Sequence, residues 1–319
     1  MVFSAEGSRP SALFKRKGLV KMNKKVSNVI YKVLFLLCLT VFLGAVGYVA
    51  YDEYQNYLAE KEIDKLGNSI STEQETETQI GTEIGTETET EEVIDELAQL
   101  NIQVPEKNLD WNVIKEENEH IYAWIYIPGT NVDYPIVQHP TDRTFYLRRG
   151  LNGKKLTAGC IFTEHMNTTD FTDPNTLIYG HNMRNQTMFA TIHNFEDKEF
   201  FENNRYIYIY MPDKVLVYDV FAAYGRDNKH LLLSYSYTSE KNIQENFDAI
   251  FKNEYKALFR DGVELTTEDK IISLSTCIRG EDDKRYIVQA VLVNPSALLK
   301  ETVEQEVVEQ EKTEQETVE

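Results

Sequence analysis

The chain has 319 residues and a formal net charge of −19, from 52 acidic and 33 basic residues. This acidic excess argues against nucleic acid as a partner, because nucleic-acid-binding proteins carry basic surfaces that neutralise phosphates. Three cysteines are too few for a disulfide framework, and the length and composition favour one folded core with appended segments.

An apolar stretch without charged residues occupies positions 33–51. A helix of this length just spans a hydrocarbon core of about 30 Å. Residues 1–32 carry eight Lys or Arg and one acid, so the positive-inside tendency predicts a cytoplasmic N-terminus and an extracellular remainder. A cleavable signal peptide is the alternative, but the run is long and Tyr48 is bulky for a cleavage site. We therefore predict a single-pass protein of the cell membrane, with a cytoplasmic basic segment at 1–32 and a transmembrane helix at 33–51.

The next part of the chain, 52–107, is predicted to form a juxtamembrane helix and an acidic Thr/Glu-rich linker. No Lys or Arg occurs between Lys65 and Lys107. Such a composition cannot bury enough apolar surface to offset its chain entropy. The linker is therefore favoured as a spacer over a binding segment with a repeated motif. The segment 299–319 is likewise predicted to be an acidic disordered tail.

Short β-rich runs separated by turn signals begin near residue 123, after short helices predicted at 93–100 and 110–122. Further helices are predicted near 187–195 and 240–252. The eight β-rich runs are 124–127, 134–137, 159–163, 176–179, 206–211, 215–223, 271–275 and 286–293. They predict a mainly β domain at 108–298, a closed or nearly closed eight-stranded barrel with N-terminal and interspersed short helices.

A strand at 271–277 is predicted to deliver Cys277 to its end. A turn around Gly280 follows, and then a second strand that starts at Arg285. Because adjacent strands lie about 5 Å apart, this hairpin brings the guanidinium of Arg285 beside the sulfur of Cys277. A fixed positive charge favours the thiolate and can receive the negative oxygen formed when a thiolate attacks a carbonyl.

Cys160 is interpreted as a small buried hydrophobe on a strand.

A second apolar strand, 176–179, ends at Gly180 and His181. The glycine is expected to allow a sharp turn, so that the histidine projects from the strand end. Histidine titrates near neutrality, which suits a group that protonates a leaving amine and later deprotonates an incoming one. The other histidines lack partners at metal-binding spacings, and the acids at 281–283 are interpreted as solvated, so neither a metal site nor a cofactor is predicted.

These motifs resemble the class B sortases, membrane-anchored cysteine transpeptidases of Gram-positive bacteria. The similar segments follow the family's order over about 108–295, and the Ser-Thr-Cys form points to class B. They are WIYIPGT at 124–130, DYPIVQ at 133–138, TLIYGHNM at 176–183, LSTC at 274–277 and RYIV at 285–288. Relatives often have Asn after the Asp of a further stretch, whereas Arg143 follows Asp142 here.

The resemblance implies a sortase-like barrel with Cys277 as nucleophile, His181 as proton carrier and Arg285 as the group that binds the substrate carbonyl. It assigns substrate binding to four further residues: Leu147, Asn182, Ser275 and Thr276.

The implied reaction cleaves a C-terminal sorting signal of secreted proteins through a thioacyl intermediate. The product is then transferred to a cell-wall amine from a peptidoglycan precursor. Three alternatives remain open: a pilin-polymerising sortase with a lysine acceptor, a hydrolytic cysteine protease, and a non-catalytic surface binding module.

Overall fold

The computed structural model describes residues 24–68 and 96–298. The basic segment before residue 24, the tract at 69–95 and the tail from 299 lie outside these residues, so their predicted properties stay predictions. The chain divides after Glu53 into two compact units, which are described separately.

The described part of the first unit belongs to one long helix, α1 (Lys24–Gly67). By length and composition this helix is a candidate membrane span. Its large apolar side chains between Val29 and Tyr51 are exposed, as expected where lipid rather than a protein core surrounds a helix. The helix continues without a break through the predicted juxtamembrane helix.

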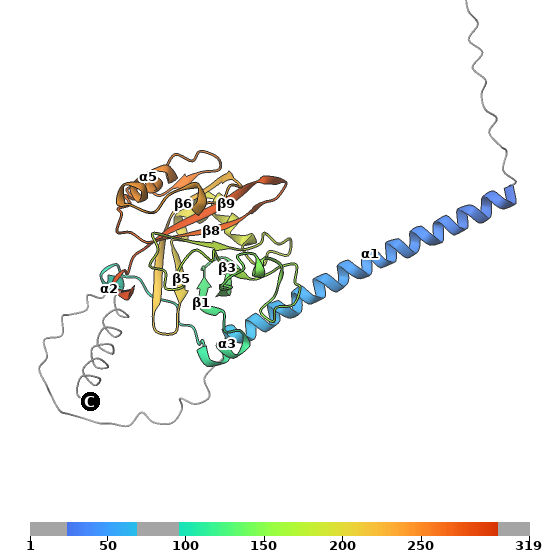
Figure 1. Cartoon of the computed structure of the whole chain (residues 1–319), viewed down its shortest axis with the longest axis horizontal. Helices are drawn as coiled ribbons and strands as arrows, with labels where there is room; N and C mark the ends of the chain where they lie inside the picture. The colour runs from blue at the N-terminus through green and yellow to red at the C-terminus, as the bar shows by residue number, and fades with distance from the viewer. Residues whose placement is uncertain (1–23, 69–95, 299–319) are drawn as a thin grey trace, which may run out of the picture. The chain divides into compact units, whose positions relative to one another are not determined.

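The second unit is a closed β-barrel (Figure 1). Its strands follow the order β5-β1-β2-β3-β4-β8-β9-β6, and β6 pairs back with β5 to close the ring. The strands are β1 (Ile121–Tyr126), β2 (Asp133–Val137), β3 (Ile161–Thr163), β4 (Asn175–Tyr179), β5 (Tyr206–Tyr210), β6 (Val215–Asp227), β8 (Ile271–Ile278) and β9 (Glu281–Leu292). A short β7 (Leu258–Phe259) pairs with β6 beyond the part that β5 occupies. The predicted eight-stranded, mainly β barrel is confirmed, and side chains fill an interior of this size.

Short helices precede the first strand or occupy the connections between strands. They are α2 (Glu96–Gln99), α3 (Trp111–Glu117), α4 (Lys198–Asn203), α5 (Glu240–Ile250) and the 3-10 helices η1 (Phe145–Arg148), η2 (Ala190–Glu196) and η3 (Leu232–Ser234). Asp110 caps α3 by accepting hydrogen bonds from the backbone N–H groups of Asn112 and Val113. The helix predicted at 110–122 ends earlier than expected, because Ile121 already pairs with β2 as part of β1.

The last turns of α1 belong to the second unit and pack against the barrel. Tyr134 Oη donates a 2.6 Å hydrogen bond to Glu60 Oε1. Ile63 and Leu66 are buried in the main core. The helix therefore ends on the domain, in a region where the sequence predicted a helix followed by a linker.

The hairpin that carries the cysteine is tighter than predicted. β8 runs to Ile278 and β9 starts at Glu281 rather than at Arg285. Only Arg279 and Gly280 connect the two strands. Gly280 has φ 81°, a left-handed conformation that glycine adopts without steric strain and that permits so short a turn.

Candidate active site

The parallel pairing of β4 with β8 brings two distant parts of the chain to one edge of the sheet. Tyr179 is the register partner of Ser275, and the backbone N–H of Gly180 donates to Ser275 O at 3.2 Å. His181 and Cys277 each follow their paired residue by two positions. Both therefore lie at the same end of the two strands.

Gly180 is required by close packing rather than by its backbone conformation. Its φ lies outside the left-handed region, and a Cβ at this position would lie 2.5 Å from Phe189 and 2.6 Å from Ile161. Both of these side chains are buried. The expected role of glycine in a sharp turn is thus corrected: its missing side chain lets the segment that carries His181 pass directly over the core.

Cys277 and Arg285 are register partners on the antiparallel strands β8 and β9, so their side chains lie on the same face. The register slips directly after this pair, and residues 282–284 form a bulge beside the cysteine. Nη1 of Arg285 donates to the carbonyls of Asp282 at 3.2 Å and Lys284 at 2.7 Å. Among the described residues these bonds use Nη1 alone, which leaves the other guanidinium donors for a substrate.

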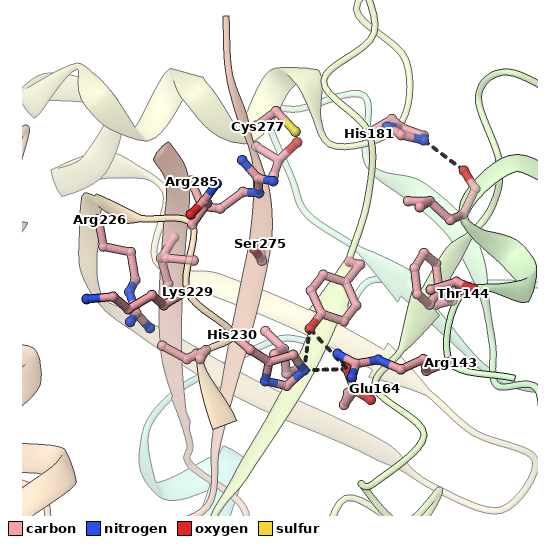
Figure 2. A pocket seen from close by; sticks show the side chains of 18 of the residues that line it. Arg143, Thr144, Glu164, His181, Arg226, Lys229, His230, Ser275, Cys277 and Arg285 are labelled. Atoms are coloured by element: carbon pink, nitrogen blue, oxygen red, sulfur yellow. Dashed lines mark hydrogen bonds and ion pairs between the residues drawn. The ribbon is translucent and has the colours of Figure 1, made fainter. Parts of the chain in front are cut away.

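Cys277, His181 and Arg285 line one pocket of about 400 Å³ (Figure 2). Segments from 143–147 and 226–231 contribute to its walls. The cysteine is exposed, so its thiol is accessible to a molecule that enters the pocket. The structure thus brings all three residues of the predicted acyl-transfer site together.

The ring of His181 faces the backbone of Leu147. Its Nε2 lies 2.8 Å from that carbonyl oxygen (Figure 2), and because a carbonyl only accepts, Nε2 carries the proton. Within 24–68 and 96–298 no hydrogen bond joins the imidazole to the Cys277 thiol. Burial lowers the pKa of His181, the bond to Leu147 opposes this, and the charge of Arg148 lowers the pKa further. The net result is a pKa below the ordinary value, which favours the neutral imidazole at pH 7.

The four residues expected to bind substrate have different surroundings. Leu147 and Ser275 line the pocket. Thr276 also lines it, but its hydroxyl donates to Gly180 O at 2.7 Å and so ties β8 to the segment that carries the histidine. The side-chain amide of Asn182 donates to the backbone carbonyl of Cys277 at 2.9 Å. Their roles in substrate binding stay predictions.

The motif analysis missed a second histidine beside Cys277. Nε2 of His193 lies 3.1 Å from the backbone oxygen of Cys277, and its Nδ1 lies 2.7 Å from Glu196 Oε1. The ring stacks on Tyr286 with centroids 4.7 Å apart. No local sequence signal marks this residue, because its contacts depend on how η2 packs against the ends of β8 and β9.

A buried carboxylate in the pocket was also missed. Glu164 is 1% exposed, and it accepts hydrogen bonds from His165, His230 and Tyr179. Burial by itself raises the pKa of Glu164, but the bonds from His165 and His230 and the charge of Arg143 outweigh it and leave the pKa lowered. An acid directly after an apolar strand was the only available signal in the sequence.

Cys160 lies apart from this chemistry. It is buried and unbridged, its thiol donates to Arg149 O at 3.3 Å, and burial raises its pKa to about 12. Such a thiol is protonated and unreactive at neutral pH. Within the described parts of the chain, no group of three or more His, Cys, Asp and Glu side chains is arranged to hold a metal ion.

An exposed thiol, an imidazole and a guanidinium, the groups that thiol-based acyl transfer uses, line one pocket of a closed barrel. A family model described as the sortase domain matches residues 125–293, which is more than half of the chain. The protein belongs to the sortase family.

The individual relatives are class B sortases. Sortase B of Listeria monocytogenes is 29% identical over 182 residues, which cover 56% of this chain and 72% of the relative. The structure of Clostridium perfringens sortase B aligns with a TM-score of 0.53 and 31% identity, over 57% of this chain and 99% of that one. A Streptococcus pyogenes class B sortase involved in pilus biogenesis aligns with a TM-score of 0.50 and 28% identity, over 57% and 97%. The chain is thus a cysteine transpeptidase of the class B type.

Proposed function

We propose that Cys277, His181 and Arg285 catalyse a transpeptidation in two half-reactions. The shared pocket supports this assignment, because a thiol, an imidazole and a guanidinium all line it, and these groups can serve as nucleophile, proton carrier and fixed cation for one substrate carbonyl. The single observation that carries it is the pair of registers: β4 beside β8 for the histidine, and β8 beside β9 for the arginine.

In the first half-reaction the neutral imidazole of His181 removes the proton of the Cys277 thiol. The thiolate attacks the carbonyl carbon of a Thr in the sorting signal, and the donors of Arg285 stabilise the oxyanion. The C–N bond then breaks, and protonated His181 gives its proton to the departing amine. In the second half-reaction an amine attacks the thioester and His181 removes its proton. The C–S bond breaks and the thiolate is restored, so atoms and charge balance over the cycle.

This cycle requires the His181 ring to leave the carbonyl of Leu147. Catalytic hydrogen bonds are often absent from a free enzyme and form only in its complex with substrate. A peptide lying against Leu147 and Ser275 would compete for the same backbone carbonyl and free the ring to turn toward Cys277. Substrate binding and proton transfer would then be coupled.

The partners follow from the same assignment. The first substrates are secreted proteins with a C-terminal sorting signal, and the acceptor is an amine of a peptidoglycan precursor. The pilus role of the Streptococcus pyogenes relative keeps a pilin lysine as the alternative acceptor. The apolar part of α1 would anchor the enzyme in the cell membrane, with a cytoplasmic N-terminus and an extracellular barrel. No cofactor takes part in these steps, and no nucleic acid is expected as a partner.

Incubation of the full-length protein with a library of Thr-containing peptides tests this function. Mass spectrometry should find a thioacyl adduct on Cys277 in the wild type, and none in Cys277→Ala. The matched variant Cys160→Ala should keep the adduct. Added amines should divert the product from the free acid, whereas a hydrolytic protease would release acid regardless. A protein that forms no adduct with any peptide is a binding module or acts on another class of substrate.

A further inference from the structure

The part of the pocket around Glu164 is centred on a carboxylate whose two oxygens already accept hydrogen bonds. Oε2 of Glu164 accepts from His230 Nε2 at 2.7 Å and from Tyr179 Oη at 3.1 Å, and Oε1 lies 2.9 Å from His165 Nδ1. With these donors in place and 1% of the side chain exposed, a substrate cannot reach the carboxylate directly. Glu164 is therefore an internal anchor for other side chains.

The charge of Glu164 is not neutralised by His230. The Nδ1 atom of His230 accepts the backbone N–H of Leu233 at 3.1 Å, so it carries no proton. The proton of the ring then sits on Nε2 and is donated to Glu164. Among the groups that contact Glu164, Arg143 is the one with a permanent positive charge, and its Nη2 lies 3.5 Å from Oε2.

Arg143 is the exposed member of this cluster. Its side chain is 43% exposed while Glu164 is 1% exposed, and Figure 2 shows its guanidinium beside Glu164, away from Cys277 and Arg285. Among the described residues the only hydrogen bond of this guanidinium is the long one from Nη2. A guanidinium has five N–H donors in a planar fork, so most of them remain for a molecule in the pocket.

The pocket as a whole is cationic, although the chain carries a net charge of −19. Asp227 is already paired with Lys229 at 3.0 Å, and the buried Nη1 of Arg226 has no hydrogen-bond partner within the described residues. Four cationic side chains line the pocket against two anionic ones: Arg143, Arg226, Lys229 and Arg285 against Glu164 and Asp227. A positive potential at this site favours an anionic group in the substrate.

We propose that Arg143 is a specificity determinant that selects peptides carrying an Asp or Glu side chain. The carboxylate of the peptide binds the free donors of Arg143 in a bidentate pair, and the buried Glu164 holds the guanidinium in place for it. This inference rests on the proposed function in that the ligand is a peptide bound in the pocket of Cys277. It adds the chemical class of one substrate side chain.

The test uses full-length Cys277→Ala protein in detergent, so that binding is measured without turnover. Fluorescent Thr-containing peptides are made in matched trios with Glu, Gln or Lys at each of the three positions before the Thr. At one position the Glu peptide should bind about tenfold more tightly than the Gln peptide, the scale of a hydrogen-bonded ion pair, and Lys should bind most weakly. The preference should shrink as salt is raised.

Variants separate Arg143 from the general field of the pocket. Arg143→Gln should abolish the preference for Glu over Gln, and Arg143→Glu should favour the Lys peptide. Lys229→Gln is the matched control: Lys229 is mostly exposed and paired with Asp227, so most of the preference should remain. An equal ratio of Glu to Gln binding in the Cys277→Ala protein, or the same ratio after Arg143→Gln, overturns the inference. If Cys277 of the wild type still forms adducts in that case, the proposed function survives; if no peptide binds, both proposals fail.

Discussion

The side-chain amide of Asn182 donates a 2.9 Å hydrogen bond to the backbone carbonyl of Cys277, across 95 positions of sequence. Nε2 of His193 lies 3.1 Å from the same oxygen and 3.0 Å from the Asn182 amide. The backbone of Cys277 is thus restrained by the segment after β4, in addition to its pairing with β9, and the ring of His193 lies beside this contact. Under the proposed function, this restraint would orient the thiol for attack on the substrate.

Replacing Asn182 by Ala should slow thioacylation clearly while it reduces the stability of the protein only slightly. Loss of one hydrogen bond costs about 1 kcal/mol of unfolding free energy, whereas misplacement of a nucleophile lowers the rate by about tenfold or more. Single-turnover adduct formation on Cys277, measured together with thermal unfolding, checks this. Asn185→Ala, in an exposed turn of the same loop, should leave the rate unchanged. Equal rates for the wild type and Asn182→Ala would remove the positioning role.

The lowered pKa of His181 should make the stability of the folded protein depend on pH. Burial lowers this pKa below 6.5 in the folded protein, so the native state binds fewer protons than the unfolded state between the two values. Stability should therefore rise with pH through that window, reach its full value above about 6.5, and fall as acid protonates the ring. Histidine NMR should give a titration midpoint below 6.5 for His181.

The corresponding control is His181→Asn. Comparison of thermal unfolding at pH 5 and pH 7.5 should show a smaller pH dependence in this variant than in the wild type, because the titrating group is gone. A midpoint at or above 6.5, or an identical pH dependence in the two proteins, would contradict the burial argument.

Gly180→Ala should damage both stability and catalysis. The new Cβ would lie 2.5 Å from Phe189 and 2.6 Å from Ile161, and both side chains are enclosed in a packed core. Overpacking of this kind costs about 1–3 kcal/mol, and relief of the clash would displace the adjacent His181. The variant should unfold at a lower temperature or denaturant concentration, and it should form the adduct on Cys277 more slowly. Gly262→Ala is a useful comparison, because a Cβ there meets no atom within 4 Å, although φ is +77° and some backbone strain is expected. Normal adduct formation in Gly180→Ala would show that the loop tolerates the displacement.

Glu164→Ala should be one of the more destabilising substitutions in the pocket. It leaves the hydroxyl of Tyr179 and the ring N–H of His230 without their acceptor, at a cost of about 1–3 kcal/mol for a buried donor. Glu164→Gln keeps one acceptor oxygen and should cost less. Because the pKa of Glu164 is lowered, the difference between wild type and Glu164→Gln should be full at neutral pH and diminish as acid protonates the carboxylate. Glu116→Ala on exposed α3 should have little effect, and a Glu164→Ala protein as stable as that control would refute the anchor role.

The local sequence pattern was sufficient to predict most of the barrel. Short runs rich in aromatic and β-branched residues, such as 206–210, identified all eight strands of the ring, since such runs bounded by turn residues are typical of strands. The same pattern did not predict where several strands and helices begin and end. β9 starts at Glu281 because the turn at Gly280 lets polar residues pair. The helix predicted near 187–195 is the 3-10 helix η2, which starts three residues later, at Ala190.

The sequence by itself determined the residues of the candidate site, because Cys277, Arg285 and His181 each lie in a motif that is recognisable along the chain. Only the tertiary structure decided that the parallel register of β4 and β8 joins the segments of His181 and Cys277, that Asn182 donates to the carbonyl of Cys277, and that Glu164 lies buried behind Arg143. The physical reason is that pairing between distant strands and the burial of a charge depend on closure of the whole barrel. No window of local sequence carries that information.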